Sequence, residues 1–267
     1  MKGRLCTQQQ IDSKDFARIC SEILKHPVIY HRKLWEFVWI LQVLEAFGKL
    51  QKGKVGLGFG CGEEQLVPAL AAVGTKIIAT DLDGSSPVAQ SWAGGGQHAS
   101  SMKAWDKFIP NVCSREAFDA NVQHAYVDMN HIPGNFLQGE YDFLWSSCSL
   151  EHLGSLKHGE EFVLNSLKAL KPGGVAVHTT EYNIRSNTTT LETPTTSIYR
   201  KRDIESILSS AEAMGYQVSV MNWSPGSQPK DKHVDLPPYL PQKVALHLKL
   251  LIDRFVCTSV GFWIRKL

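Results

Sequence analysis

The chain of 267 residues contains no C-x-x-C pair, because its six cysteines stand far apart along the sequence. Without such a pair, cysteine spacing gives no sign of a disulfide framework. We expect reduced and mostly buried thiols, which is the usual state of cysteine in a cytoplasmic protein.

Signals for secretion or membrane insertion are also missing. The first residues, MKGRLCTQQQ, lack the apolar core of a signal peptide. The longest apolar stretch, LWEFVWILQVLEAF, is interrupted by Glu36, Gln42 and Glu45, so it does not predict a membrane span. These absences lead us to expect a cytoplasmic location.

The sequence also has almost no excess of positive or negative charge. Lys and Arg number 28 against 26 Asp and Glu, which leaves a net charge of +2. The basic residues form no stripe interleaved with aromatic residues, so nucleic acid is not the expected partner. A small-molecule or glycan substrate is expected, and a homodimer is one alternative for the assembly state.

From residue 54 onward, apolar runs typical of strands alternate with helical patterns. The predicted strands are 54–59, 76–82, 124–130, 141–148, 175–182, 216–223 and 255–265. The predicted helices between them are 63–74, 159–170 and 200–215. This alternation predicts an α/β sandwich around a largely parallel sheet.

Outside this pattern we expect an N-terminal cap and two insertions. Residues 12–50 have apolar side chains at helical spacing, so we expect a helical N-terminal cap over residues 1–53. A second domain then spans 54–267, with insertions at 84–123 and 224–250. Because ligands of open α/β sheets lie beyond the carboxyl ends of the strands, these insertions are expected to shape a pocket.

The stretch GLGFGCGEE directly follows the first predicted strand. A dinucleotide-binding G-x-G-x-x-G pattern fails there in every register, and no G-K-[ST] of a phosphate-binding loop follows. Gly58, Gly60 and Gly62 would bend the strand and bring backbone close to a ligand. Glu63 and Glu64 then open a helix, where two carboxylates would repel a pyrophosphate. The turn therefore favours a ligand with positive charge and no phosphate.

Five segments follow one another between about residues 54 and 182: GFGCGEE, IIATDLD, YVDMN, YDFLWSSCSLEHL and LKPGGVAVHTTEY. In this order they resemble the motifs of class I S-adenosylmethionine-dependent methyltransferases of the type 11 kind. The resemblance is to bacterial proteins associated with surface-polysaccharide gene sets. It implies a Rossmann-like sandwich with a seven-stranded, mostly parallel sheet whose last strand is antiparallel.

The resemblance also implies S-adenosylmethionine as the cofactor. Asp81 would accept hydrogen bonds from both ribose hydroxyls, and Asp128 from the adenine amino group. Leu82 and Met129 would sandwich the adenine ring. The alternatives are a solvated turn acid for Asp81 and a helix cap for Asp128. The predicted cofactor residues are Gly58, Gly60, Gly62, Glu63, Asp81, Leu82, Asp128, Met129 and Ser146.

One position departs from the family pattern, which usually has an acid where this chain has Gly58. In the family that acid commonly meets the ammonium of the methionine part of the cofactor. Either Glu63 or Glu64 replaces it here, or the ammonium meets backbone carbonyls near Gly58 and Ser146.

The methyl acceptor should lie near the loop SSCSLEHLGS after the fourth strand of the motif series. This loop lacks the Asn/Asp-Pro-Pro-Tyr run typical of nucleobase and glutamine amide methyltransferases, which argues against those acceptors. An alcohol acceptor needs a general base or a metal that lowers its pKa. Cys148 in this loop is expected to serve strand packing, since no activating cation is evident nearby in the sequence.

Four residues are candidates for that chemistry: His152, Glu181, His233 and Asp235. Their convergence would form a base dyad or a set of nitrogen and oxygen ligands for a divalent ion, and the metal requirement stays open. Trp35, Trp39 and Trp92 either stack on a sugar or aromatic ring or belong to the core.

The sequence thus predicts an S-adenosylmethionine-dependent O-methyltransferase that acts on a small-molecule or glycan hydroxyl. A natural-product or protein methyltransferase is the alternative enzyme. A non-catalytic subunit that only binds the cofactor is the alternative from a different functional class.

Overall fold

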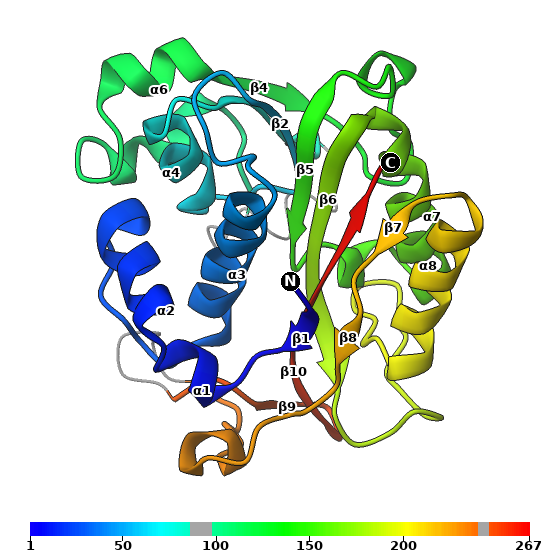
Figure 1. Cartoon of the computed structure of the whole chain (residues 1–267). Coiled ribbons are helices and arrows are strands. Elements are labelled where there is room, and N and C mark those ends of the chain that lie inside the picture. The colour runs from blue at the N-terminus through cyan, green and yellow to red at the C-terminus, as the bar shows by residue number, and fades with distance from the viewer. Residues whose placement is uncertain (86–97, 240–245) are drawn as a thin grey trace.

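A single mixed sheet runs through the computed structural model, which describes residues 1–85, 98–239 and 246–267 (Figure 1). Its parallel strands lie in the order β4 (Val122–Tyr126), β3 (Lys76–Asp81), β2 (Val55–Phe59), β5 (Tyr141–Ser147) and β6 (Leu170–Asn183). The next strand, β10 (Phe255–Arg265), pairs antiparallel with β6. The predicted fold, a mostly parallel sheet with an antiparallel last strand, is confirmed.

Helices cover both faces of the sheet, as Figure 1 shows. One face carries α3 (Arg32–Ala46), α4 (Leu66–Ala72) and α6 (Arg115–Asn121), and the other carries α7 (Leu156–Ser166) and α8 (Lys201–Ala213). Successive side chains of a strand point to opposite faces. Phe143 and Trp145 of β5 accordingly join the core beneath α3 and α4, whereas Leu144 joins the core beneath α7. Burial on both faces explains why these strands read as nearly continuous apolar runs.

The N-terminal region is helical for most of its length but begins with a strand. β1 (Gly3–Leu5) lies beside β10 in the sheet, and α1 (Gln8–Ile11), α2 (Lys14–Ile19), the π-helical η1 (Cys20–Leu24) and α3 follow it. The helical prediction for 12–50 is thus confirmed for residues 14–24 and 32–46, whereas residues 25–31 separate η1 from α3. The division of the chain at residue 53 stays a prediction.

The tryptophans of α3 belong to the core. Trp35 and Trp39 are each only 1% exposed, which decides against a role in stacking on a substrate ring. A Cβ atom on Gly261 of β10 would lie 2.6 Å from the Trp39 ring, so glycine at this position allows α3 to approach the sheet closely. Trp92 lies outside the described residues.

The predicted sixth strand is divided in two. β7 (Gln217–Val218) pairs with β10, whereas β8 (Met221–Asn222) pairs with β1, because β1 has taken the place beside β10. A further strand, β9 (Leu250–Ile252), forms a hairpin with β10. The described residues therefore form a sheet of ten strands in place of the predicted seven.

Short helical turns occupy most of the remaining connections. They are η2 (Met102–Phe108), η3 (Gly134–Phe136), η4 (Leu150–His152), η5 (Leu167–Ala169) and η6 (Pro229–Lys232). The predicted insertions contain η2, α6 and η6, and their residues 86–97 and 240–245 lie outside the described part of the chain. In the part that is described, every helix is too short or too polar to cross a membrane.

Candidate functional site

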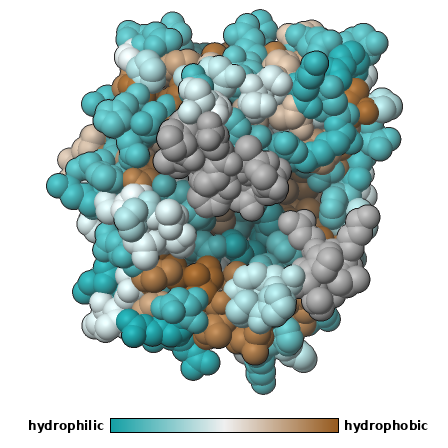
Figure 2. Space-filling model, turned by 180° about the vertical axis from the view of Figure 1, so that it is seen from behind, coloured by the Kyte–Doolittle hydropathy of each residue, from teal (hydrophilic) through white to brown (hydrophobic). Residues whose placement is uncertain are grey.

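A cavity of about 820 Å³ opens at the carboxyl ends of β2, β3 and β5. Its walls come from the start of α3, the glycine turn after β2, the end of β3, residues 127–130 after β4 and residues 147–154 after β5. The face shown in Figure 2 is hollowed near its middle, with hydrophilic residues inside the hollow. A cavity of this volume suits a small organic ligand.

The glycine turn after β2 forms one wall of the cavity. Two of its residues take the left-handed backbone conformation. Gly60 has φ +57° and Gly62 has φ +52°, which favours glycine at both positions. A Cβ atom on Gly60 would lie 2.6 Å from Oγ of Ser149, and Ser149 Oγ itself donates to the Gly60 carbonyl at 3.2 Å. The turn therefore exposes backbone to the cavity with no room for a larger residue at position 60.

Gly58 lies inside β2 and is a glycine for a different reason. A Cβ atom there would lie 2.3 Å from the Trp145 ring and 2.4 Å from the Cys61 sulfur. Its carbonyl accepts from the Thr80 hydroxyl at 2.7 Å. Gly58 does not line the cavity, and the packing explains why no acid stands at this position.

Asp81 ends β3 and fixes the glycine turn. It is 8% exposed, and its carboxylate accepts hydrogen bonds from three backbone N–H groups, those of Gly62 (3.0 Å), Ala99 (3.0 Å) and Leu82 (2.9 Å). Asp81 also lines the cavity. A carboxylate has about four lone-pair positions, so one remains for a ligand hydroxyl.

The predicted adenine residues lie together on the same side of the cavity. Leu82, Asp128 and Met129 all line it. The Asp128 carboxylate accepts from the Asn130 N–H at 2.8 Å and lies 3.1 Å from Nδ1 of His131. Asp128 therefore caps a turn of its own loop while its side chain stays 45% exposed.

Arg32 and Lys33 line the opposite wall and belong to a buried network of charges behind it. Glu36 of α3 is fully buried and lies 3.1 Å from Arg32 and 3.5 Å from Lys33. Arg32 also pairs with Glu181 of β6. Burial acts against the charged form of Glu36, but Lys33 and Arg32 outweigh it and hold its pKa below the ordinary value. Burial raises the pKa of Glu181 to about 7, although the charge of Arg32 opposes the shift.

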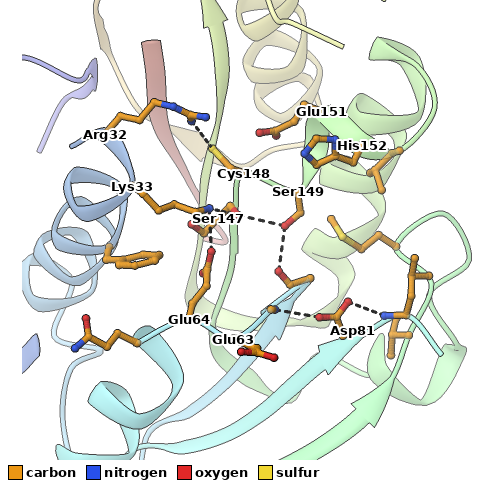
Figure 3. Close-up of a pocket in the computed structure, with 18 of the residues that line it drawn as sticks. Arg32, Lys33, Glu63, Glu64, Asp81, Ser147, Cys148, Ser149, Glu151 and His152 are labelled. Atoms are coloured by element: carbon orange, nitrogen blue, oxygen red, sulfur yellow. Dashed lines mark hydrogen bonds and ion pairs between the residues drawn. The ribbon is translucent and has the colours of Figure 1, made fainter. Parts of the chain in front are cut away.

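The two glutamates after the glycine turn have different partners. Glu63 is 30% exposed and pairs with Lys107 of η2 at 2.6 Å. Glu64 is 14% exposed and pairs with Lys33 of α3 at 2.9 Å. Burial raises the pKa of Glu64 to about 7, even though Lys33 favours its charged form. Figure 3 shows the Glu64 side chain directed toward Lys33.

The loop after β5 supplies the upper wall in Figure 3. Cys148 has φ +48°, an uncommon conformation for a residue with a side chain, and its thiol donates to Glu36 at 3.1 Å. Glu151 is fully buried. Its Oε2 accepts from the Thr180 hydroxyl at 2.7 Å, whereas its Oε1 has no hydrogen-bond partner within the described ranges.

His152 lines the cavity next to Glu151 (Figure 3). Its Nδ1 lies 2.8 Å from the carbonyl oxygen of Thr195. A carbonyl can only accept, so Nδ1 carries the proton and the neutral ring has its lone pair on Nε2.

The other predicted catalytic residues lie elsewhere. Glu181 is buried against Arg32, and His233 is exposed after η6. Asp235 pairs with His247 at 2.7 Å and not with His233. Of the four candidates, His152 alone belongs to the described lining of the cavity. The structure does not bring the four together.

The two remaining expectations are Ser146 in the cofactor site and a possible metal site. Ser146 is fully buried in β5, and its hydroxyl is 2.8 Å from Nδ1 of His178, so it does not line the cavity. In the described part of the chain, no three His, Cys, Asp or Glu side chains are grouped as metal ligands.

Sequence reasoning missed several residues of the site, namely Arg32, Lys33, Glu36 and Glu151. One signal for the first three was visible. Glu36 interrupts the longest apolar run, and a carboxylate on a buried helix face requires partners. The signal for Glu151 was its place beside His152 in the loop nearest the acceptor.

The charges around the cavity suit a cationic ligand. Five carboxylates line it (Glu63, Glu64, Asp81, Asp128 and Glu151) against three basic side chains (Arg32, Lys33 and Lys107), a difference of two negative charges when all are ionised. S-adenosylmethionine has a net positive charge and no phosphate. The open glycine turn fits its polar groups, as do the buried oxygens of Glu64 and Glu151 that have no partner among the described residues.

Comparison with known proteins agrees with this geometry. Residues 31–238 match the family model described as "Methyltransferase domain". No curated protein matches the sequence.

Solved structures share the fold at low identity. A protein of Galdieria sulphuraria described as a sarcosine dimethylglycine methyltransferase is 16% identical, with a TM-score of 0.54 over 87% of this chain and 86% of that one. A methyltransferase of Bacillus halodurans C-125 is 13% identical, with a TM-score of 0.52 over 87% and 99% of the two chains. The [4+2]-cyclase SpnF is 18% identical, with a TM-score of 0.52 over 84% and 80%.

At these identities the structural neighbours establish the fold alone, whereas the family model spans most of the chain. The chain belongs to the methyltransferase-domain family, as a class I S-adenosylmethionine-dependent methyltransferase with S-adenosylmethionine as its cofactor.

Proposed function

We propose that this protein transfers the methyl group of S-adenosylmethionine to a hydroxyl oxygen of a small molecule or glycan. The observation that carries the proposal is the pair Glu151–His152, two proton acceptors in the loop after β5 that line one cavity with the glycine turn. Either side chain can act as the general base that removes the proton of an alcohol acceptor. An acceptor that is already ionised has no such proton and needs no base.

For the cofactor we propose the roles that the motif positions imply. Asp81 accepts from a ribose hydroxyl through its remaining lone pair, while its backbone contacts hold the glycine turn in place. Asp128 receives the adenine amino group, and Leu82 and Met129 lie against the ring. The bound cofactor supplies an activated methyl group on a sulfonium centre.

The protein's own task is then to place the acceptor in line and to take its proton. Transfer would form the oxygen–carbon bond and break the carbon–sulfur bond, with the electron pair left on sulfur as a thioether. The hydroxyl proton passes to Nε2 of His152 or to Oε1 of Glu151. His152 is held in the required tautomer by Thr195, and Glu151 is held by the Thr180 hydroxyl.

The negative charge of the cavity limits which chemical groups can act as the methyl acceptor. A buried carboxylate such as Glu151 disfavours an anionic acceptor and favours one that donates a hydrogen bond. This supports a hydroxyl acceptor over a carboxylate acceptor. The bacterial surface-polysaccharide setting implied by the motif resemblance makes glycans and nucleotide sugars the first acceptors to test.

The test is a transfer assay with S-adenosylmethionine labelled in its methyl group and separate pools of nucleotide sugars, oligosaccharides and phenolics. We expect label in one pool and an equal amount of S-adenosylhomocysteine. Repeating the assay with a chelator decides whether a divalent ion takes part. A protein that binds the cofactor product but labels none of the pools would favour a non-catalytic subunit.

Variants of the proposed bases test the mechanism once an acceptor is found. Glu151→Gln or His152→Ala should lower turnover by about 100- to 10,000-fold, the range for losing one general base, with the affinity for S-adenosylhomocysteine nearly unchanged. His158→Ala, on α7 and outside the cavity, is the matched control. His233→Ala and Asp235→Asn in the same assay decide whether their segment takes part. Near-native rates for both Glu151→Gln and His152→Ala would refute the base assignment.

A further inference from the structure

One carboxylate of the cavity, Glu64, is a candidate to replace the acid that position 58 lacks. Glu64 lies at the start of the segment that leads to α4, two residues after Gly62. Its Oε1 is 2.9 Å from the Lys33 ammonium, and its Oε2 is buried with no partner in the described part of the chain. A buried carboxylate oxygen without a hydrogen bond is costly, so a ligand group is expected to complete it.

Lys33 is shared between two carboxylates. Its ammonium lies 2.9 Å from Glu64, 3.5 Å from Glu36 and 3.4 Å from the Ser147 carbonyl. Burial favours the neutral amine, but Glu64 and Glu36 raise the pKa of Lys33 and keep it charged. The side chain is still 30% exposed and lines the cavity. It therefore has the position and the charge to donate to a ligand carboxylate.

The network as a whole has an excess of negative charge. Arg32 and Lys33 supply two positive charges, and Glu36, Glu64 and Glu181 supply three negative ones, which leaves one negative charge when all are ionised. An amino-acid group presents an ammonium and a carboxylate side by side. The ammonium would balance Glu64, and the carboxylate would meet Lys33.

The location fits the same end of the cofactor. In Figure 3, Lys33 and Glu64 lie on one side of Glu63 and Asp81 lies on the other, and all four residues line the cavity. A ligand whose ribose is at Asp81 and whose chain follows the glycine turn would bring its far end to Lys33 and Glu64.

The other candidates for this contact are occupied or remote. Glu63 pairs with Lys107, and the Gly58 carbonyl already accepts from Thr80. The Ser146 hydroxyl is buried against His178. Glu64 is thus the carboxylate best placed to replace the acid that position 58 lacks.

We propose that Lys33 and Glu64 together bind the amino-acid end of S-adenosylmethionine, with Glu64 accepting from its ammonium and Lys33 donating to its carboxylate. The proposal rests on the cofactor assignment but not on the identity of the acceptor. It makes the N-terminal helix α3 part of the cofactor site. Through Glu36, which contacts Lys33 and Arg32, the same helix joins the cofactor to the acceptor side of the cavity.

Two nucleosides test this subsite by calorimetry. S-adenosylhomocysteine has the amino-acid end, whereas 5′-methylthioadenosine has the same adenosine and thioether but ends in a methyl group. Glu64→Gln and Lys33→Met should each weaken binding of S-adenosylhomocysteine by about tenfold or more, the effect expected for losing a hydrogen bond to a charged group. Binding of 5′-methylthioadenosine should change by less than about twofold, since groups that share no partner usually contribute independently to binding.

Matched controls lie outside the cavity. Glu45→Gln on the same helix α3 and Lys157→Met on α7 make the same chemical changes at exposed ion pairs and should leave both affinities unchanged. If Glu64→Gln lost affinity for both nucleosides equally, or for neither, the proposed subsite would be refuted. If the wild-type protein bound neither nucleoside, the cofactor assignment itself would fail, which is a distinguishable result.

A measurement on the unaltered protein covers the case in which a variant does not fold. The charged groups acting on Glu64 are Lys33 and Glu36 of α3 and Asp81 of β3. With the Glu64 pKa near 7, the carboxyl is mostly neutral at pH 6 and mostly ionised at pH 8. Affinity for S-adenosylhomocysteine should therefore rise over this range while that for 5′-methylthioadenosine stays flat. Parallel curves for the two nucleosides would contradict the proposal.

Discussion

At the scale of single residues, the glycine turn shows two different reasons for one residue type. Gly60 is required by a positive φ and by the closeness of Ser149, whereas Gly58 is required by the Trp145 ring packed against β2. Only the first reason concerns a ligand directly. The second explains why the family's acid is absent and why the acid function moves to another residue.

Gly60→Val should abolish cofactor binding. The new side chain would need a left-handed backbone that β-branched residues rarely adopt, and its Cβ would lie 2.6 Å from Ser149 Oγ. Calorimetry with S-adenosylhomocysteine measures the effect. Gly134→Val is the control, because a Cβ atom at Gly134 meets nothing within 4 Å. A Gly60→Val protein that bound normally would show that the turn has only a structural role.

Asp81→Ala should weaken the binding of S-adenosylhomocysteine and of 5′-methylthioadenosine to the same extent. Glu64→Gln, in contrast, should weaken only the binding of S-adenosylhomocysteine. The change removes the ribose contact and also the acceptor for three backbone N–H groups, each bond to a charged group contributing about 1.5–3 kcal/mol. We expect both affinities to fall by about tenfold or more, together with a lower melting temperature of the free protein. Unchanged affinity for both nucleosides would remove Asp81 from the site.

At the scale of elements, α3 carries more of the site than its sequence pattern indicates. The apolar spacing within 12–50 predicted helical structure here, and the structure confirms it over Arg32–Ala46. The role of its charged residues could not be predicted, because their partners are far away in the chain. Arg32 and Glu181 are separated by 149 positions, and Glu36 and Ser259 by 223. Such contacts depend on which strands the fold places beside the helix.

The segment after η6 shows that residues close together in the sequence need not be partners in the structure. His233 and Asp235 stand two positions apart, so their side chains would lie on the same side of an extended chain. The structure pairs Asp235 with His247 because Asp235 forms a β-bridge with Leu250 and so lies beside the segment that contains His247. Pairing between segments decided the partner, and one sequence does not reveal that pairing.

Glu36→Gln tests whether α3 is held by its buried charges. The fully buried carboxylate compensates Arg32 and Lys33, and its loss leaves buried positive charge without a partner. The expected loss of unfolding free energy is about 3–5 kcal/mol, measured by urea denaturation. Glu45→Gln, exposed near the end of the same helix, should stay within about 0.5 kcal/mol of the parent protein. A loss for Glu36→Gln as small as that of the control would mean that the network adds nothing to stability.

At the scale of the whole molecule, the motif order was enough to predict the parallel sheet and the antiparallel last strand. The unpredicted part is the edge of the sheet, where β1 enters beside β10 and divides the sixth strand. β1 has three residues, and so short a segment has no periodicity from which a strand could be recognised. The same contact places the N-terminal region against the sheet, where α3 reaches the cavity.

The central claim is that this molecule moves a methyl group from its cofactor to a hydroxyl oxygen. The most direct test uses S-adenosylmethionine with a ¹³C-labelled methyl group and the acceptor pool that accepts label, followed by NMR of the product. The account predicts a methyl ether resonance that grows in step with S-adenosylhomocysteine and is nearly absent with Glu151→Gln or with His152→Ala. Label found on nitrogen or in a carboxylate ester, or bound cofactor that never gives up its methyl group to any pool, would contradict it.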